Sequence, residues 1–158
     1  MRERKAARLL VINPALEVLL FKFCHHDDAL AGTSHWATPG GGLEEGETFH
    51  AAAIRELREE TGIHVNEVAG PVAERRVSLL LPSGEPVLAV EQYFVVHVPD
   101  NGLCRSEWTE HEKKVMAEPR WWSARELRNT QETVWPENLV QMLAEASSGF
   151  ENRSVTSI

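Results

Sequence analysis

The apolar and polar stretches along the chain predict two pairs of strands, one on each side of a central helix. Short apolar runs at Leu9–Ile12 and Val18–Phe23 are separated by an Asn-Pro turn signal, which predicts the first pair. Longer apolar runs at Val72–Leu81 and Val87–Val98 flank the turn-like segment PSGEP and predict the second pair. The segment between the pairs, from about Glu47 to Thr61, has the pattern of a helix.

Helix and strand signals continue toward the C-terminus. The central helix is expected to end at Gly62, because glycine is the usual residue of a helix C-terminal cap. Farther along, Arg120–Trp122 predicts a short strand, and Ser123 can cap a short helix at Ala124–Arg128. A last amphipathic helix is expected from about Pro136 to Ala146. This order predicts an α/β (α+β) fold in which a mixed β-sheet lies between helices.

Length and charge limit the domain count and the class of partner. The 158 residues suit one domain, expected over residues 1–147, with a flexible tail over residues 148–158. The net charge of −8 argues against nonspecific binding to a nucleic-acid backbone, which requires a basic surface. A small anionic substrate that binds together with a divalent cation is compatible with this charge.

Cysteine use and hydropathy bear on the compartment. Cys24 and Cys104 are the two cysteines of the chain, and their spacing matches no CxxC motif. Two isolated cysteines favour a reduced, cytoplasmic protein over a disulfide framework. No apolar run approaches the roughly 20 residues that a membrane span requires. We therefore expect no membrane partner.

The central helix carries glutamates that repel one another. Glu56, Glu59 and Glu60 are related by steps of three and four residues, so they share one face of the helix. Like charges at this spacing destabilise a helix by about 0.2–0.5 kcal/mol per pair. A solvated charged face is the ordinary explanation for such a helix taken alone. The alternative is a bound Mg²⁺ or Mn²⁺, because clustered carboxylates are the hard oxygen ligands that these ions prefer.

Three glycines at residues 40–42 precede this helix and strengthen the metal hypothesis. Glycine allows close backbone approach and positive φ, so this loop can present carbonyl oxygens to the same cation. A glycine-rich loop that leads into a helix with clustered carboxylates can hold a metal together with a diphosphate.

The segment from Gly41 to Ile63 resembles the Nudix signature GX5EX7REUXEEXGU, in which U is an aliphatic residue. Every fixed position is filled at the right spacing, and the preceding WATPGG is similar to the usual lead-in of the family. The resemblance extends over about residues 5–147. It implies a Nudix αβα sandwich and a Mg²⁺-dependent hydrolase, with Mn²⁺ as an alternative ion, that cleaves nucleoside diphosphates linked to another group. The matching residues are Gly41, Glu47, Arg55, Glu56, Leu57, Glu59, Glu60, Gly62 and Ile63.

The same resemblance implies roles for the residues of the signature. Glu56 is implied to bind metal or orient the attacking water, and Arg55 to hold a glutamate in place through a charge-assisted hydrogen bond. Glu47 is implied to support Arg55. The implied catalytic residues are therefore Arg55, Glu56 and Glu59. The implied metal ligands are the carboxylates of Glu56, Glu59 and Glu60 and a main-chain carbonyl of Gly40 or Gly41.

Residues outside the signature are candidates for substrate binding. In many members of the family an acidic residue from a distal loop assists. The candidates here are Glu107, Glu110, Glu112 and Glu118, of which Glu112 is favoured, and a solvated surface role is the ordinary alternative for each. Arg75 lies in a strand that is expected to border the cleft. Trp108 and Trp135 lie in expected loops, where they can flank a base. Asn138 stands where mutator-type members read a purine edge with an asparagine, but an Asn at a helix start also has an ordinary capping use.

The range of expected substrates is narrowed because residues typical of two subfamilies are absent from their positions past the signature. A proline at a set distance past the signature is typical of ADP-ribose pyrophosphatases, and a tyrosine farther on is typical of dinucleoside polyphosphate hydrolases. Pro71 and Pro82 miss the first position, and Tyr93 misses the second. The expected substrate is therefore a (d)NTP or an oxidised dNTP that yields NMP and pyrophosphate. ADP-ribose, another nucleotide sugar or a dinucleotide stays open, as do a nucleotide-sensing module without catalysis and a homodimer.

Overall fold

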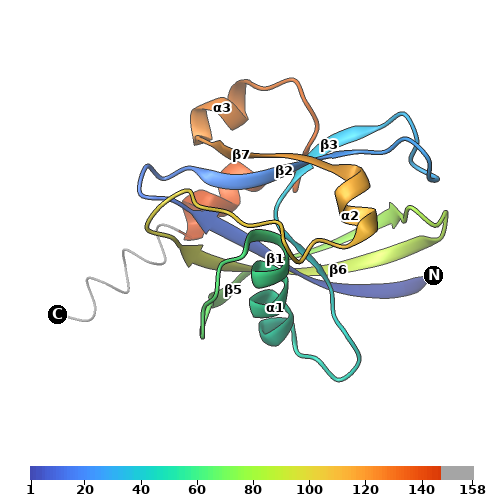
Figure 1. Ribbon diagram of the computed structural model, residues 1–158, viewed down its shortest axis with the longest axis horizontal. Coiled ribbons are helices and arrows are strands. Elements are labelled where there is room, and N and C mark those ends of the chain that lie inside the picture. The colour runs from blue at the N-terminus through green and yellow to red at the C-terminus, as the bar shows by residue number, and fades with distance from the viewer. Residues whose placement is uncertain (147–158) are drawn as a thin grey trace.

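The structure, a computed structural model, describes residues 1–146, and their strands form one eight-stranded mixed sheet. The tail expected over residues 148–158 lies outside the described residues. The strands are β1 (Arg2–Ile12), β2 (Val18–Cys24), β3 (Ser34–Ala37), β4 (Gly40–Gly42), β5 (Ala69–Leu80), β6 (Pro86–His97), β7 (Met116–Trp122) and β8 (Val134–Trp135). Their order across the sheet is β5-β6-β1-β2-β3-β8, while β4 pairs with β1 and β7 pairs with β2 (Figure 1).

The helices are α1 (Phe49–Thr61), α2 (Glu110–Val115), α3 (Ala124–Asn129) and a last helix over residues 139–146. α1 begins later than expected because Thr48 is its N-cap, with a side-chain oxygen that accepts a bond from the Ala51 N–H. It ends at Gly62, whose φ of 77° is the left-handed conformation of the predicted C-terminal cap. None of the helices that the structure describes is long and apolar enough to cross a membrane.

β1 lies at the centre of the sheet and changes its neighbour along its length. On one side it pairs in parallel with β6 over all 11 residues. On the other side it pairs with β2 at Ile12↔Val18, while Ala6–Arg8 pair with the short strand β4. β2 and β3 therefore diverge from the N-terminal half of β1, and a cavity lies between the two sets of strands.

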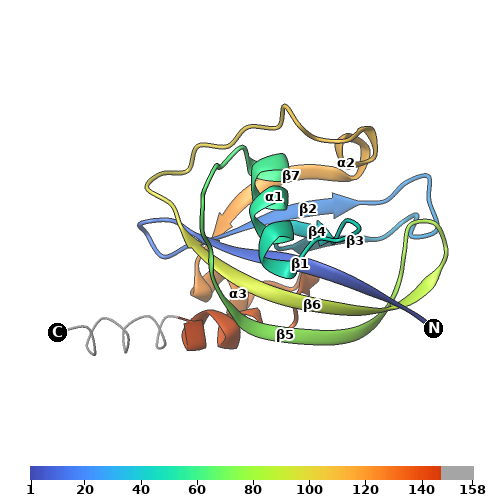
Figure 2. The same cartoon turned by 90° about the horizontal axis from the view of Figure 1, so that it is seen from below.

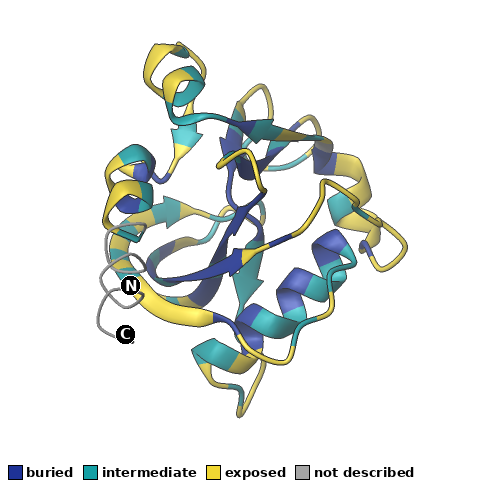
Figure 3. Ribbon diagram, turned by 90° about the vertical axis from the view of Figure 1, so that its left-hand side faces the viewer, coloured by how far each residue is buried: buried dark blue, intermediate teal, exposed yellow. Residues whose placement is uncertain are grey.

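Two hydrophobic clusters cover opposite faces of the sheet. α1 packs on one face, where Ala53 and Leu57 share a cluster with Leu9 of β1. The last helix packs on the other face, where Leu139 shares a cluster with Leu10. Figure 2 shows α1 and the last helix on opposite sides of the strands, and Figure 3 shows the buried residues gathered in the central strands. The predicted mixed sheet between helices is therefore confirmed.

Candidate functional site

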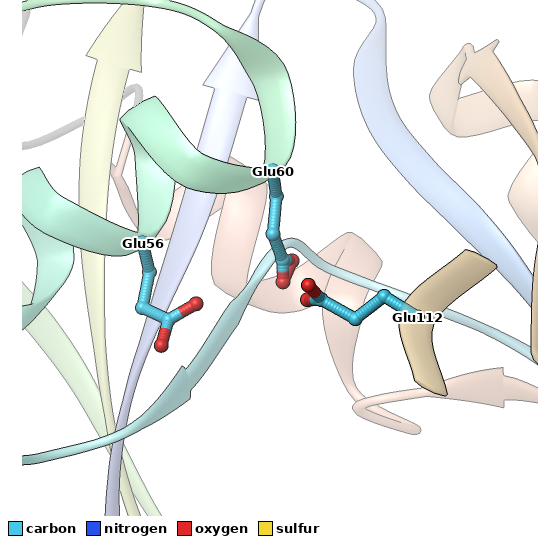
Figure 4. A group of neighbouring side chains, drawn as sticks. All are labelled: Glu56, Glu60 and Glu112. Atoms are coloured by element: carbon cyan, nitrogen blue, oxygen red, sulfur yellow. The ribbon is translucent and has the colours of Figure 1, made fainter. Parts of the chain in front are cut away.

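Three carboxylates from two helices converge beside the central strands. Glu56 and Glu60 project from successive turns of α1, and Glu112 projects toward them from α2 (Figure 4). One oxygen from each of these carboxylates lies within 4.8 Å of the others, and Glu56 and Glu60 are buried. Among the described residues, this is the one such group of three potential metal-binding side chains. The charged face of α1 is therefore covered by a third carboxylate rather than open to solvent.

The carboxylate group has more negative than positive charge around it. Burial and the neighbouring Glu56 raise the pKa of Glu60 well above its ordinary value. Burial also raises the pKa of Glu56, although Arg55 acts in the opposite direction. The Gly40 N–H donates to the two oxygens of Glu60 at 3.3 and 3.2 Å. Carboxylates this close favour a divalent cation, because its charge offsets the cost of ionising them together.

Arg55 connects the other acidic side chains of the signature. Its guanidinium donates two hydrogen bonds to Glu47, both at 2.8 Å, and a third to the Gly42 carbonyl oxygen at 3.0 Å. Its Nη1 donates to Glu56 at 2.9 Å and to Glu59 at 3.1 Å. The bonds to Glu47 contribute most to a raised pKa of Arg55, so this residue stays a cation. The expected bond from Arg55 to a glutamate and its expected support by Glu47 are both present.

Glu59 and the glycines lie beside the carboxylate group. The Glu59 carboxylate stays outside the group of three, so its role as a metal ligand stays a prediction. A Cβ on Gly41 would come within 2.6 Å of a Glu56 oxygen, and a Cβ on Gly40 would clash with the Ala7 carbonyl oxygen. Gly40 also has a φ of 146°, so its backbone favours glycine as well. The role of a Gly40 or Gly41 carbonyl as a ligand also stays a prediction.

Glu112 is placed by a segment that is tied to the end of α1. The Trp108 indole N–H donates to the main-chain oxygen of Glu60 at 2.8 Å. The next residue, Thr109, is the N-cap of α2, and its side chain accepts the Glu112 N–H while the Glu112 carboxylate accepts the Thr109 N–H at 2.9 Å. Trp108 is buried in the core beside Phe21, so the prediction that it can flank a base is wrong.

A cavity of about 610 Å³ opens beside the carboxylates, between β1, β5 and β6 on one side and β2 and β3 on the other. This volume is in the range of small-molecule sites, roughly 300–1,000 Å³. Of the four predicted substrate-binding residues, Arg75, Glu112 and Trp135 line the cavity. Asn138 does not line it, and its carbonyl instead accepts the Met142 N–H at 3.0 Å in the first turn of the last helix.

Sequence reasoning missed a paired charge network in the wall of this cavity. Glu91 on β6 accepts hydrogen bonds from Arg8 at 3.1 Å, from Arg75 at 2.9 Å and from the Tyr93 hydroxyl at 3.1 Å. Burial acts to raise the pKa of Glu91, but the two arginines outweigh burial and the pKa is lowered. The available signal was a single charged residue within the apolar run VLAVEQYFVV, because such a position is buried and requires a partner.

Comparisons with known proteins agree with this geometry. The family model described as the NUDIX domain matches residues 2–143. This chain belongs to the Nudix family. RNA pyrophosphohydrolase from Novosphingobium aromaticivorans is 34% identical over 73 residues, which cover 46% of this chain and 42% of that protein. The chloroplastic Nudix hydrolase 26 of Arabidopsis thaliana is 51% identical over 35 residues, which cover 22% of this chain and 16% of the relative. The chain thus spans less than half the length of these relatives.

Solved structures of Nudix proteins have the same fold. A MutT protein from Methanosarcina mazei Go1 superimposes with a TM-score of 0.68 at 18% identity, covering 94% of this chain and 95% of that chain. The Nudix domain of Shewanella oneidensis NrtR, solved with ADP ribose, gives 0.63 at 14% identity, covering 95% and 90%. A C. elegans Ap4A hydrolase gives 0.59 at 21% identity, covering 94% and 98%. At these identities the likeness shows the fold, and it confirms the predicted Nudix fold.

Proposed function

We propose that this chain is a divalent-metal-dependent hydrolase that cleaves the diphosphate bond of a nucleoside diphosphate linked to another group. The observation that carries this proposal is the convergence of Glu56, Glu60 and Glu112 beside the cavity of about 610 Å³. A merely solvated helix face would not bring a third carboxylate onto two buried ones. Membership of the Nudix family supports the same reaction class.

The donor set of the site fits Mg²⁺, with Mn²⁺ as the alternative ion. Both ions prefer carboxylate and carbonyl oxygens, which are the groups that gather here. Glu56, Glu60 and Glu112 would hold the ion, and Glu59 and a carbonyl of Gly40 or Gly41 are the further ligands proposed. A bound ion polarises phosphoryl oxygens, activates water and stabilises the leaving group.

The chain's own residues orient the reacting groups. Arg55 fixes Glu56 and Glu59 through bonds of 2.9 and 3.1 Å, so both carboxylates keep one orientation. A water held by Glu56 attacks one phosphorus of the diphosphate, and the bridging P–O bond breaks with its electron pair on the leaving phosphate. Glu56, whose carboxylate Arg55 holds in one orientation, takes the proton of this water.

The nucleoside of the substrate is proposed to occupy the cavity. Trp135 lines the cavity and is 37% exposed, so its ring is accessible to a base. Arg75 holds this ring in place, with its guanidinium 5.3 Å from the ring centroid. The substrate that we propose is a (d)NTP or an oxidised dNTP, which gives NMP and pyrophosphate.

One alternative substrate class has support of its own, and one alternative to catalysis is argued against. The structural neighbours include a Nudix domain solved with ADP ribose and an Ap4A hydrolase, which favours a nucleotide sugar or a dinucleotide. A nucleotide-sensing module without catalysis is the other alternative. The presence of all four signature glutamates, Glu47, Glu56, Glu59 and Glu60, argues against it.

Phosphate release from a panel of nucleotides tests the proposal. The panel contains dNTPs, 8-oxo-dGTP, ADP-ribose, dinucleoside polyphosphates and capped RNA, with Mg²⁺ or Mn²⁺, each with and without added pyrophosphatase. We expect hydrolysis of one class, abolished by Glu59→Gln and retained by Glu110→Gln, whose glutamate side chain on α2 is 88% exposed. Silence across the panel, with metal bound and the fold intact, would instead support the sensing module.

A further inference from the structure

Arg4 differs from the other arginines near the site because it has no acidic partner. Arg8, Arg55 and Arg75 each have a carboxylate oxygen within 3.1 Å. Arg4 is partly buried and forms no ion pair with any residue that the structure describes. Burial and the nearby Arg8 lower the pKa of Arg4 and outweigh Glu56 and Glu91, which raise it from beyond ion-pair distance, but a guanidinium remains charged in proteins. A partly buried guanidinium without a carboxylate is available to an external anion.

Arg4 lies where two cavities meet. It lines the main cavity together with Glu60 and Glu112. It also lines a second cavity of about 550 Å³ between the first residues of β1 and the loop that follows β4. The residues that line this second cavity are Arg2, Glu3, Arg4, Lys5, Gly42, Leu43, Glu44 and Glu47. Arg4 therefore borders the main cavity and the second cavity at once.

Arg4 and Glu56 lie against neighbouring glycines of the short strand β4. A Cβ on Gly41 would meet the Glu56 carboxylate at 2.6 Å, and a Cβ on the next residue, Gly42, would meet the Arg4 guanidinium at 3.2 Å. Successive residues of a strand face opposite sides, so the carboxylates and Arg4 flank the same three-residue strand. The glycines of β4 therefore leave room for the Glu56 carboxylate on one side of the strand and for the Arg4 guanidinium on the other.

We propose that Arg4 binds a substrate phosphate that lies beyond the diphosphate bond that is cleaved, so that the substrates are nucleotides with at least three phosphates. The inference rests on the proposed hydrolase function and refines its substrate class. A third phosphate gives Arg4 a two-bond, charge-assisted contact. A nucleotide sugar such as ADP-ribose has a neutral sugar at this place and leaves Arg4 without a partner.

Kinetics on matched substrates provide the first test. We compare kcat/KM for the triphosphate and the diphosphate of the same nucleoside in the wild type, Arg4→Ala, Arg4→Lys and the control Arg76→Ala. Arg76 faces solvent, with 58% of its side chain exposed, and lines neither cavity. The wild type should prefer the triphosphate about tenfold or more, Arg4→Ala should lose this preference, and Arg4→Lys should keep part of it. Arg76→Ala should behave like the wild type.

A dinucleoside tetraphosphate distinguishes the source of the third phosphate. One outcome is that Arg4→Ala loses turnover of this substrate, while the wild type turns over little of a simple triphosphate. The substrate would then be a dinucleoside polyphosphate, which supplies the third phosphate. An equal loss in Arg4→Ala on diphosphate and triphosphate, or no loss on either, would overturn the inference.

Binding of inorganic phosphates tests Arg4 without turnover. Isothermal titration with tripolyphosphate and with pyrophosphate, in the presence of Mg²⁺, should show tighter binding of tripolyphosphate by the wild type and no such difference in Arg4→Ala. This result, together with silence in every hydrolysis assay, would retain Arg4 as a phosphate-binding residue and reject the hydrolase. Equal affinity of the wild type for the two probes would reject the role of Arg4 even in an active hydrolase.

Discussion

Two charged clusters border the cavity: the Glu91 network and the carboxylate group of Glu56, Glu60 and Glu112. They shift the pKa of a buried glutamate in opposite directions. Glu91 is surrounded by the donors of Arg8, Arg75 and Tyr93, all within 3.1 Å, and its pKa is lowered. Glu60 receives a main-chain N–H at 3.2 Å and faces two other carboxylates, and its pKa is raised. The two glutamates are similarly buried, so the difference lies in their partners and not in their depth.

This difference indicates which cluster has its negative charge balanced by residues of the protein itself. The Glu91 network supplies its own counter-charges and connects β1, β5 and β6. The carboxylate group keeps an excess of negative charge, which lowers stability unless a cation from outside binds there. The first arrangement favours a structural role, and the second favours a functional one.

The variant Glu60→Gln should produce the largest effect. It tests whether the carboxylate group serves catalysis at a cost in stability. Turnover should fall on the order of 10³-fold, since the loss of a metal-binding carboxylate removes several kcal/mol of transition-state stabilisation. The metal-free variant should nevertheless be about 1 kcal/mol more stable than the wild type, because a crowded buried carboxylate becomes neutral. Steady-state kinetics with Mg²⁺ and urea titrations in EDTA measure the two effects. A loss of metal-free stability would contradict this reading.

The variant Glu91→Gln tests the structural side of the comparison. It leaves Arg8 and Arg75 as partly buried cations with weakened partners, so the free energy of unfolding should fall by about 3 kcal/mol at pH 7. The matched control is Glu85→Gln, which removes the exposed partner of Arg2 and should cost below about 1 kcal/mol. Urea denaturation gives both values, and equal losses in the two variants would refute the structural role.

The wild type and Glu91→Gln should differ in the free energy of unfolding by an amount that depends on pH. The direction of this dependence follows from the lowered pKa of Glu91. The pKa of Glu91 is lower in the folded state than in the unfolded state, where it is about 4.3. Its contribution is therefore present above that value and is lost as the pH falls through the folded-state pKa. The gap between the wild type and Glu91→Gln should be full at neutral pH and should narrow below about pH 4.

Mg²⁺ should stabilise the protein through the carboxylate group and not through the Glu91 network. At a concentration of 100 times its Kd, the ion should add about 2.7 kcal/mol to the free energy of unfolding. Thermal unfolding with increasing Mg²⁺ should show this increase in the wild type and in Glu91→Gln. The increase should be much smaller in Glu60→Gln, and an undiminished increase there would exclude Glu60 as a ligand.

The variant Trp108→Phe should produce the smallest effect. It keeps an aromatic ring beside Phe21 but removes the N–H that binds the Glu60 carbonyl, so stability should fall by about 1 kcal/mol. Turnover should fall about tenfold, since this bond helps to hold the segment that carries Glu112. The control is Trp122→Phe, because the Trp122 Nε1 is buried and has no hydrogen-bond partner among residues 1–146. If both variants have equal turnover and Mg²⁺ affinity, Trp108 has no positioning role.

Elements with a local signal could be predicted from the sequence. α1 and its cap at Gly62 were predictable because apolar spacing and the capping residue lie within one short segment. The β5–β6 hairpin was predictable because two apolar runs flank a turn. The contact between Arg55 and Glu47 was also expected, because both belong to one recognisable motif.

The sequence alone determined that Glu56, Glu59 and Glu60 share one helix face after a glycine loop, because helical periodicity places residues that are three and four apart on one side. Tertiary structure decided which carboxylates meet. It brought Glu112 to Glu56 and Glu60, buried Trp108 beside Phe21, and paired Glu91 with two arginines from other strands. These contacts join segments that are distant along the chain. Whether such segments come close in space depends on the strand order and on the point along β1 where its neighbour changes from β4 to β2.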